Sequence, residues 1–170
     1  RYAVGEQGKV LNELVKHHDV VLVAGEGDGK MWDTISKDVI REECPQLRRA
    51  ISPLHDAIAA LKLRKIYKKY KPDIIHLHSS KAGILGRLAF PRRKVVYTVH
   101  GFDSIRKAFR KFLPIERQLQ RRCKAIVAVS RYDEINLIEE GITKGVSTVY
   151  NGINRPNTDG ISVPDVFKKY

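Results

Sequence analysis

Short apolar runs recur along the chain, and most of them end at a polar or small residue. They are rich in Val, Ile and Leu and cover residues 19–24, 74–78, 95–99, 125–129 and 146–150. Runs that are continuously apolar, rather than alternating, are typical of strands buried on both faces of a parallel sheet. Helical patterns separate them. The sequence therefore predicts an α/β fold, with a Rossmann-like parallel sheet flanked by helices.

Amphipathic stretches between the runs predict the helices. In residues 53–70, apolar side chains fall at helical spacing, and Ser52 and Pro53 form an N-terminal capping pattern; the apolar residues are Leu54, Ile58, Leu61, Leu63 and Ile66. Residues 9–17 (after the glycine-rich turn 5–8), 80–90 and 133–140 are also expected to be helical. In the helix over 80–90, Gly83 and Gly86 predict close packing against a strand. Residues 30–52 predict a short helix and a strand-like or irregular passage.

Composition narrows the class of protein. A chain of 170 residues, 42% hydrophobic and 30% charged, is typical of one soluble globular domain. The net charge of +13 favours an anionic partner, which could be nucleic acid, an anionic membrane surface or a phosphorylated small substrate. Cys44 and Cys123 are far apart and outside any metal-ligand spacing, which indicates a reducing compartment and no zinc site. No apolar run approaches the length of a membrane span. Because the chain begins at Arg1 with polar and glycine residues, we expect that a first strand is missing.

Histidines mark two of the predicted strand ends. His76 and His78 lie at the end of one apolar run, and His100 follows another. Ligands of open parallel sheets bind outside the carboxyl ends of the strands, so these side chains are candidates for a site, although strand-end histidines also occur with purely structural roles. His100 and Asp103 could together orient or deprotonate a hydroxyl. The chain carries no GxGxxG, Walker or GxSxG motif and no helix-turn-helix or RNA-binding signature. The residues alone thus indicate an α/β domain that handles a phosphate-bearing ligand.

Residues 105–124 combine regularly spaced apolar side chains with many cations. This pattern fits a helix on a membrane surface, and it equally fits a solvated helix whose apolar stripe packs on the sheet. Pro114 is expected at a kink or between two helices.

Longer motifs connect these features to a known family. PDIIHLHSSKAGILGRLA, VVYTVHGF, AIVAVSRYDEINLIEEGI and VSTVYNGI resemble the N-terminal domain of the family 4 retaining glycosyltransferases, which have the GT-B fold. The nearest likeness is to bacterial members that build capsule, exopolysaccharide or lipid-linked glycans, and it covers residues 5–153. The resemblance implies an N-terminal Rossmann-like domain over residues 1–153. Residues 154–170 would then be a linker toward an absent C-terminal domain that binds the donor.

The resemblance also assigns residues. It implies that His100 is the active-site histidine that contacts the transferred sugar, with Gly101 and Phe102 in the same loop. It places Gly5 near the donor diphosphate, although Val4 stands where the family usually has a second glycine. Substrate-binding positions on the acceptor side and around the cleft are Ser79, Ser80, Lys81, Ser130 and Asn151.

For the full enzyme, the resemblance implies transfer of a hexose from a nucleotide sugar to an acceptor hydroxyl, with retention. The acceptor would be a glycan or a lipid-linked glycan, and no cofactor, metal or nucleic acid is expected. The fragment alone should be inactive, and the enzyme would lie on the inner, cytoplasmic face of the bacterial membrane. The residues expected to face the anionic membrane are Arg106, Lys107, Phe109, Arg110, Lys111 and Phe112. Two alternatives remain at this point: a sugar-nucleotide epimerase of the same architecture, and a non-catalytic basic binding module.

Overall fold

The computed structural model of the chain describes residues 6–25, 30–48 and 50–152, and all strands within them run parallel. Strand β1 (Val21–Ala24) pairs with β2 (Ile40–Glu43). A second sheet has the order β3-β4-β5-β6, with β3 at Ile75–His78, β4 at Val95–Val99, β5 at Ala125–Ala128 and β6 at Val146–Thr148. The predicted α/β class with parallel strands flanked by helices is confirmed.

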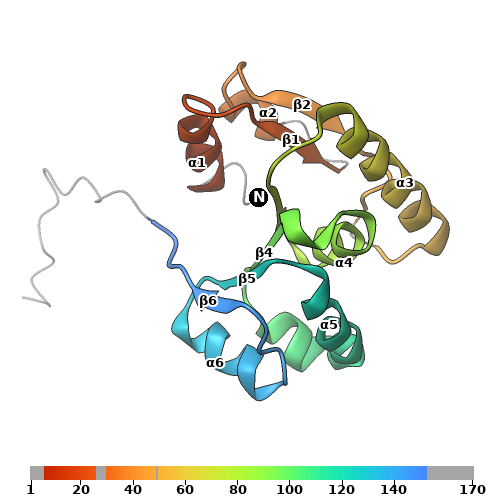
Figure 1. Ribbon diagram of the computed structural model, residues 1–170, viewed down its shortest axis with the longest axis vertical. Coiled ribbons are helices and arrows are strands. Elements are labelled where there is room, and N and C mark those ends of the chain that lie inside the picture. Colours follow the sequence, from red (N-terminus) through yellow and green to blue (C-terminus); the bar gives the residue numbers. More distant parts are fainter. Residues whose placement is uncertain (1–5, 26–29, 49, 153–170) are drawn as a thin grey trace, which may run out of the picture.

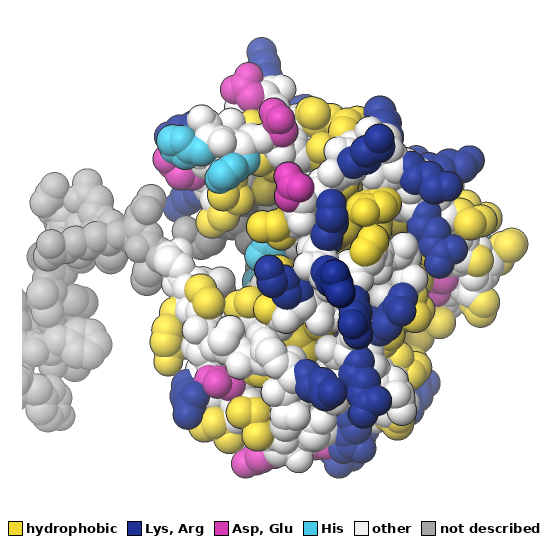
Figure 2. All heavy atoms as spheres, viewed as in Figure 1, with side chains coloured by type: hydrophobic (Ala, Val, Ile, Leu, Met, Phe, Trp, Pro, Cys, Tyr) yellow, Lys and Arg dark blue, Asp and Glu magenta, His cyan; other side chains and the backbone are white. Residues whose placement is uncertain are grey.

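Helices lie on both sides of the strands (Figure 1). Their bounds are α1 Glu6–Leu14, α2 Lys30–Thr34, α3 Pro53–Tyr70, α4 Ser80–Ala89, α5 Leu113–Leu119 and α6 Arg131–Glu139. The 3₁₀ turns η1, η3 and η4 cover Arg92–Lys94, Arg110–Phe112 and Gln120–Arg122, and a π-helical turn, η2, covers Ser104–Ala108. In Figure 1, α3, α4, α5 and α6 follow one another around the right and lower side of the strands, and α1 lies at the upper left. Helix α4 contacts both α3 and α5, so these three helices form one layer. Many Lys and Arg side chains gather on this side of the molecule (Figure 2).

One hydrophobic core joins the two sheets. Strand β4 supplies Val95, Tyr97 and Val99, which are all less than 5% exposed, as expected for a strand covered on both faces. Cys44, just after β2, and Ala59 of α3 are fully buried in the same cluster. The β1–β2 pair therefore belongs to the same folded unit as the four-stranded sheet.

Two glycines of α4 allow this helix to approach the sheet closely, as the sequence predicts. A Cβ atom on Gly83 would lie 2.5 Å from Cε2 of Tyr97. On Gly86 it would lie 2.5 Å from a methyl carbon of Leu77 in β3. Real Cβ atoms do not approach other atoms this closely, so a side chain at either position would have to push the helix or the strand aside.

A buried ion pair connects α4 to α5. Nη2 of Arg87 lies 2.6 Å from Oε2 of Glu116, and the two side chains are 0% and 3% exposed. Nε of Arg87 donates to the carbonyl of Gly83 at 2.8 Å, and its guanidinium lies 4.4 Å from the ring centroid of Tyr97. No sequence pattern predicts this pair, because neither residue stands out from the other charges around it.

Several expectations about the helices need correction. Helix α1 begins at Glu6, so Gly8 lies inside the helix and not in a turn before it. Helix α3 has the predicted bounds, but Ala59 and Leu63 are its buried residues, whereas Leu54, Ile58 and Leu61 are 70%, 42% and 57% exposed.

Residues 105–124 form no single helix. They divide into short turns and α5, with Pro114 in the first turn of α5, which confirms the expectation that it separates two helical segments. The proposed linker, residues 154–170, lies outside the described residues.

The packing at Gly83 predicts the effect of adding one methyl group. Gly83→Ala should lower the free energy of unfolding by about 1–3 kcal/mol, because the new Cβ meets a Tyr97 ring that is 2% exposed and covered by Arg87. Urea unfolding of both proteins measures the change. The control is Gly152→Ala, where a Cβ would have no atom within 4 Å and stability should change by less than about 0.5 kcal/mol. Equal losses in the two variants would contradict the packing argument.

Candidate functional site

Three histidines meet at the carboxyl end of strands β3 and β4. His76 and His78 are two residues apart on β3, so they share a face of the sheet, and their ring centroids are 4.1 Å apart. Nδ1 of His78 lies 3.0 Å from Nε2 of His100, just after β4, and these two rings stack. Nε2 of His76 is 2.6 Å from Oγ1 of Thr98. The histidines that the sequence marks at two strand ends are thus joined by a chain of direct contacts.

Desolvation lowers the pKa of all three histidines. The pKa of His78 falls to about 4, because burial disfavours its charged form and because His76 and His100 are close by. Burial also lowers the pKa of His76 and of His100, while the carboxylate of Asp133 acts in the opposite direction on His100. At neutral pH the cluster is therefore uncharged. Neutral imidazoles can both donate and accept hydrogen bonds, which suits them to hold hydroxyl groups of a ligand.

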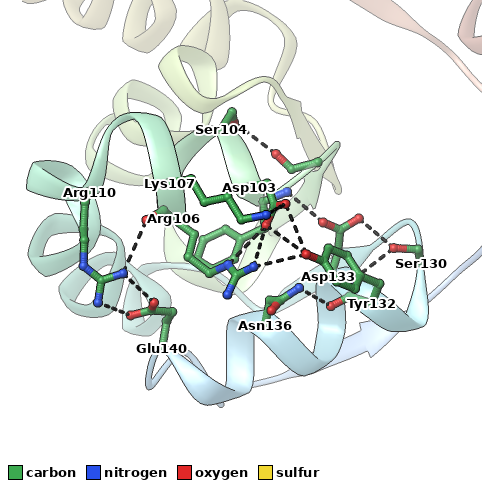
Figure 3. A network of polar contacts seen from close by, with 12 residues as sticks. Asp103, Ser104, Arg106, Lys107, Arg110, Ser130, Tyr132, Asp133, Asn136 and Glu140 are labelled. Atoms are coloured by element: carbon green, nitrogen blue, oxygen red, sulfur yellow. Dashed lines mark hydrogen bonds and ion pairs between the residues drawn. The ribbon is translucent and has the colours of Figure 1, made fainter.

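The loop after β4 is fixed by a carboxylate from α6. Oδ1 of Asp133 accepts the backbone N–H of Phe102 at 2.7 Å, and Oδ2 accepts the hydroxyl of Ser130 at 2.7 Å (Figure 3). Asp133 is 6% exposed and Phe102 is 1% exposed. Gly101, at φ +80°, lets the chain turn between His100 and this anchor. The position of His100 therefore depends on α6 as well as on its own strand.

Asp133 was missed as a site residue in the sequence, although a signal for it exists. Ser130 caps α6, and its hydroxyl accepts the backbone N–H of Asp133 at 3.1 Å. A serine followed three residues later by an acidic residue is the pattern of a capping box. The pattern could have identified the helix start, but it could not show that the carboxylate also reaches the loop after β4.

Asp103 is engaged elsewhere, and the suggested His100–Asp103 pair does not form among the described residues. Its carboxylate accepts hydrogen bonds from Lys107 at 2.7 Å and from Arg106 at 2.9 Å, and the hydroxyl of Tyr132 lies 3.2 Å away (Figure 3). Lys107, and then Arg106 and Tyr132, lower the pKa of Asp103. The nearby carboxylate with an electrostatic effect on His100 is that of Asp133.

The predicted acceptor-side residues start α4, and Lys81 has protein partners. Ser79 is the N-cap, with the unusual φ of +76°, and its hydroxyl accepts the N–H of Ala82. Ser80 is the first residue of the helix. The ammonium group of Lys81 lies 2.6 Å from the carboxylate of Asp56 and donates to the carbonyl of Ala50. Of these three residues, the two serines lie next to the histidine cluster along the chain.

The remaining predicted residues fall at the edge of what the structure describes. Asn151 follows β6 and is exposed. Gly5 lies outside the described residues, so its predicted place near a diphosphate is untested. Within residues 6–25, 30–48 and 50–152, no group of three or more His, Cys, Asp or Glu side chains could hold a metal ion.

The segment expected to face a membrane carries cations that are mostly paired with carboxylates. Arg106 and Lys107 pair with Asp103, and Arg110 pairs with Glu140 at 2.8 Å (Figure 3). Phe109 is 54% exposed, and its ring centroid is 6.3 Å from that of the half-buried Phe112. The ammonium group of Lys111 lies 5.5 Å from the Phe112 centroid. None of the helices in the described part of the chain has both the length and the apolar composition to cross a bilayer.

Comparisons with known proteins agree with the motifs. A family model described as Glycosyltransferase Family 4 matches residues 9–155. The chain is 42% identical over 87 residues to the UDP-Gal:alpha-D-GlcNAc-diphosphoundecaprenol alpha-1,3-galactosyltransferase of Escherichia coli, which covers 49% of this chain and 22% of that protein. It is 36% identical over 102 residues to an uncharacterized 41.2 kDa protein in the cps region of Klebsiella pneumoniae, with 53% and 28% covered. The matches thus span about a quarter of these relatives' lengths.

The low pKa of His78 predicts acid sensitivity in a defined window. Between pH 6.5, where an ordinary histidine titrates, and about pH 4, the unfolded chain binds a proton that His78 of the folded protein does not. The free energy of unfolding should therefore decrease as the pH is lowered through this range. His78→Gln should reduce this slope by up to about 1.4 kcal/mol per pH unit, the value for one proton. Urea unfolding at pH 6.5, 5.75 and 5 gives the slope. His18→Gln, on an exposed residue outside the cluster, should keep it; the same slope in all three proteins would contradict the assignment.

Proposed function

Since the chain belongs to glycosyltransferase family 4, as its motifs predicted, we propose that it is the acceptor-binding, N-terminal half of a glycosyltransferase. The full enzyme transfers a hexose from a nucleotide sugar to an acceptor hydroxyl, and the anomeric configuration is retained. Residues 1–153 form this half, and residues 154–170 lead to a separate domain that binds the donor. By itself the half is inactive, because the donor must be held by the other domain.

The observation that carries the proposal is the uncharged histidine cluster at the carboxyl end of β3 and β4. Open parallel sheets bind their ligands at this end. The His78–His100 contact at 3.0 Å holds the His100 ring, and the bond from Phe102 to Asp133 holds the backbone that follows it. Preorganised donors and acceptors of this kind stabilise charge as it develops on a reacting sugar, because they need not reorient during the reaction.

His100 has the catalytic role in this proposal, and the surrounding residues bind or position. His100 contacts the transferred sugar near the reacting centre, while Gly101 and Phe102 shape its loop. Ser79 and Ser80 follow β3, and Ser130 follows β5, where its hydroxyl bonds Asp133. Together with Asn151 after β6, these residues form the rim of the proposed substrate site. Lys81, which pairs with Asp56, can orient α4 relative to α3 and reach an acceptor only after leaving that carboxylate.

The acceptor we propose is a glycan carried on a lipid diphosphate. The Escherichia coli relative is named for a diphosphoundecaprenol acceptor. Such an acceptor lies in a membrane, so the enzyme would bind peripherally to the inner, cytoplasmic face of the cell membrane. The exposed Phe109, with Phe112 and Lys111 beside it, is the part of the predicted segment best suited to enter the headgroup region.

The two alternatives have less support. A sugar-nucleotide epimerase would share the parallel sheet. However, the family whose model matches the chain is a glycosyltransferase family, and the Escherichia coli relative is named as a galactosyltransferase. A non-catalytic basic module would explain the charge of +13, but it would leave the histidine cluster, and the hydrogen bond that anchors the loop after His100, without a role.

The catalytic role of His100 has a direct test. In the full-length protein, His100→Ala should reduce hexose transfer at least about 10²-fold, because it removes the group that contacts the reacting sugar. The assay follows radiolabelled hexose from a panel of UDP-hexoses into a lipid-diphosphate acceptor, and NMR of the product gives the anomeric configuration. His18→Gln should retain activity. Transfer by His100→Ala at the rate of the unchanged protein would overturn the assignment.

Membrane contact through the aromatic pair can be measured separately. Phe109→Ser with Phe112→Ser should reduce sedimentation with phosphatidylglycerol vesicles about tenfold or more, since each buried Phe contributes roughly 1.5–3 kcal/mol. Val10→Ser, which removes a similarly exposed apolar side chain on α1, is the control and should bind as before. If both proteins bind vesicles equally well, this segment is not the contact.

A further inference from the structure

The amino end of the four-stranded sheet carries a concentration of positive charge. Basic residues lie in the turns before all four strands of this sheet: Lys71, four residues before β3; Arg92, Arg93 and Lys94 before β4; Arg121, Arg122 and Lys124 before β5; and Lys144, two residues before β6. The parallel register brings these turns to one edge. It is the edge opposite the histidine cluster, so its charge serves no part of the site described above.

A groove of about 470 Å³ lies at this edge. Its lining residues are Arg92, Arg93, Gln120, Arg121, Cys123, Lys124, Lys144 and Gly145. Five of these eight are cations and none is acidic. We refer to this recess as the amino-edge groove. Its volume is in the range of small-molecule sites.

The five cations of the amino-edge groove have no carboxylate partner within the described residues. Other cations of the protein do: Arg110 and Arg117 share Glu140, and Arg131 pairs with Glu134. Neighbouring like charges repel each other, and ordinarily an acidic side chain or solvent offsets this cost. Here five positive groups from the three turns before β4, β5 and β6 converge without an acidic residue among them, which favours an anion as the missing counter-charge.

The frame of the groove is rigid. The amide of Gln120, itself 9% exposed, accepts the backbone N–H groups of Thr143 and Lys144 through Oε1. Its Nε2 donates to the carbonyls of Arg117 and Gly141. These four hydrogen bonds fix the turn before β6 against η4, so the side chains of Lys144 and Arg121 start from preset backbone positions. A ligand would not need to order this backbone, which reduces the entropic cost of binding.

We propose that the amino-edge groove binds the phosphate groups of a compact polyanion of the diphosphate class. Arginine matches phosphate oxygens with paired N–H donors, and lysine adds point charge. None of the lining residues of the groove is an exposed large apolar side chain. The groove therefore has no side chain that could insert into the apolar part of a bilayer. This site lies beyond the proposed transfer reaction: β4 separates it from His100, so a ligand held here acts on the protein and not on the reacting sugar.

Calorimetry with sodium pyrophosphate tests the site in the full-length protein. The groove variant combines Arg93→Gln with Lys144→Gln. The matched control combines Lys65→Gln with Lys68→Gln, which removes the same charge from the exposed face of α3. We expect pyrophosphate to bind the unchanged protein and the control with affinities within twofold, and to bind the groove variant at least tenfold more weakly. Affinity should fall on going from 50 to 200 mM NaCl. Equal thermal unfolding temperatures without ligand would show that the variants are folded.

Two results would overturn the proposal: no pyrophosphate binding by the unchanged protein, or equal binding by the groove variant and the control. Vesicles of phosphatidylglycerol distinguish the sources of phosphate. If the groove variant loses vesicle binding and pyrophosphate competes with vesicles for the unchanged protein, the ligand is a lipid headgroup. If the groove variant binds vesicles as well as the unchanged protein does, the ligand is a soluble diphosphate. Tighter binding of a DNA duplex than of pyrophosphate, lost in the groove variant, would replace the compact ligand by nucleic acid and contradict the proposal.

Discussion

The carboxylate of Asp133 joins two loops that come from different strands. It accepts the Phe102 amide after β4 and the Ser130 hydroxyl after β5, and it is almost fully buried. Without it, a buried backbone N–H would lose its partner, at a cost of about 1–3 kcal/mol. The backbone that follows His100 would then be free to move. The orientation of one imidazole at a strand end thus depends on a side chain that begins the helix after the next strand.

Much of this architecture follows from local patterns. The apolar runs predicted the bounds of β3, β4 and β5 to within one residue. A strand covered on both faces buries nearly all its side chains, so it is apolar along its length and its ends are marked by polar residues. The glycines at 83 and 86 predicted the close approach of α4, because no other residue fits a helix pressed on a sheet. The meeting of His78 with His100 also followed from topology, since parallel strands end at the same edge.

Other features depend on partners that are distant in the sequence. The apolar residues of α3 predicted its length but not which side is buried: the helix packs through Ala59 and Leu63, and Leu54 faces outward. Asp103 looked like a partner for His100, yet cations one helical turn away reach it first. The sequence also assigned the positive charge to residues 106–112, where the structure pairs most of it with carboxylates. Five cations without a carboxylate partner among the described residues lie instead at the amino edge, because three turns that are far apart in the chain converge there.

The Arg87–Glu116 pair limits how this domain can diverge. A buried charge that loses its partner costs about 3–5 kcal/mol, which is a large share of the 5–15 kcal/mol that keeps a typical domain folded. Replacing both charges with apolar side chains of similar volume can leave stability unchanged. Either single replacement, however, leaves an unpaired buried charge and destabilises the domain. Descendants of this sequence should therefore keep both residues or lose both. Among them, positions 87 and 116 should vary as a coupled pair, although 29 positions separate them in the chain.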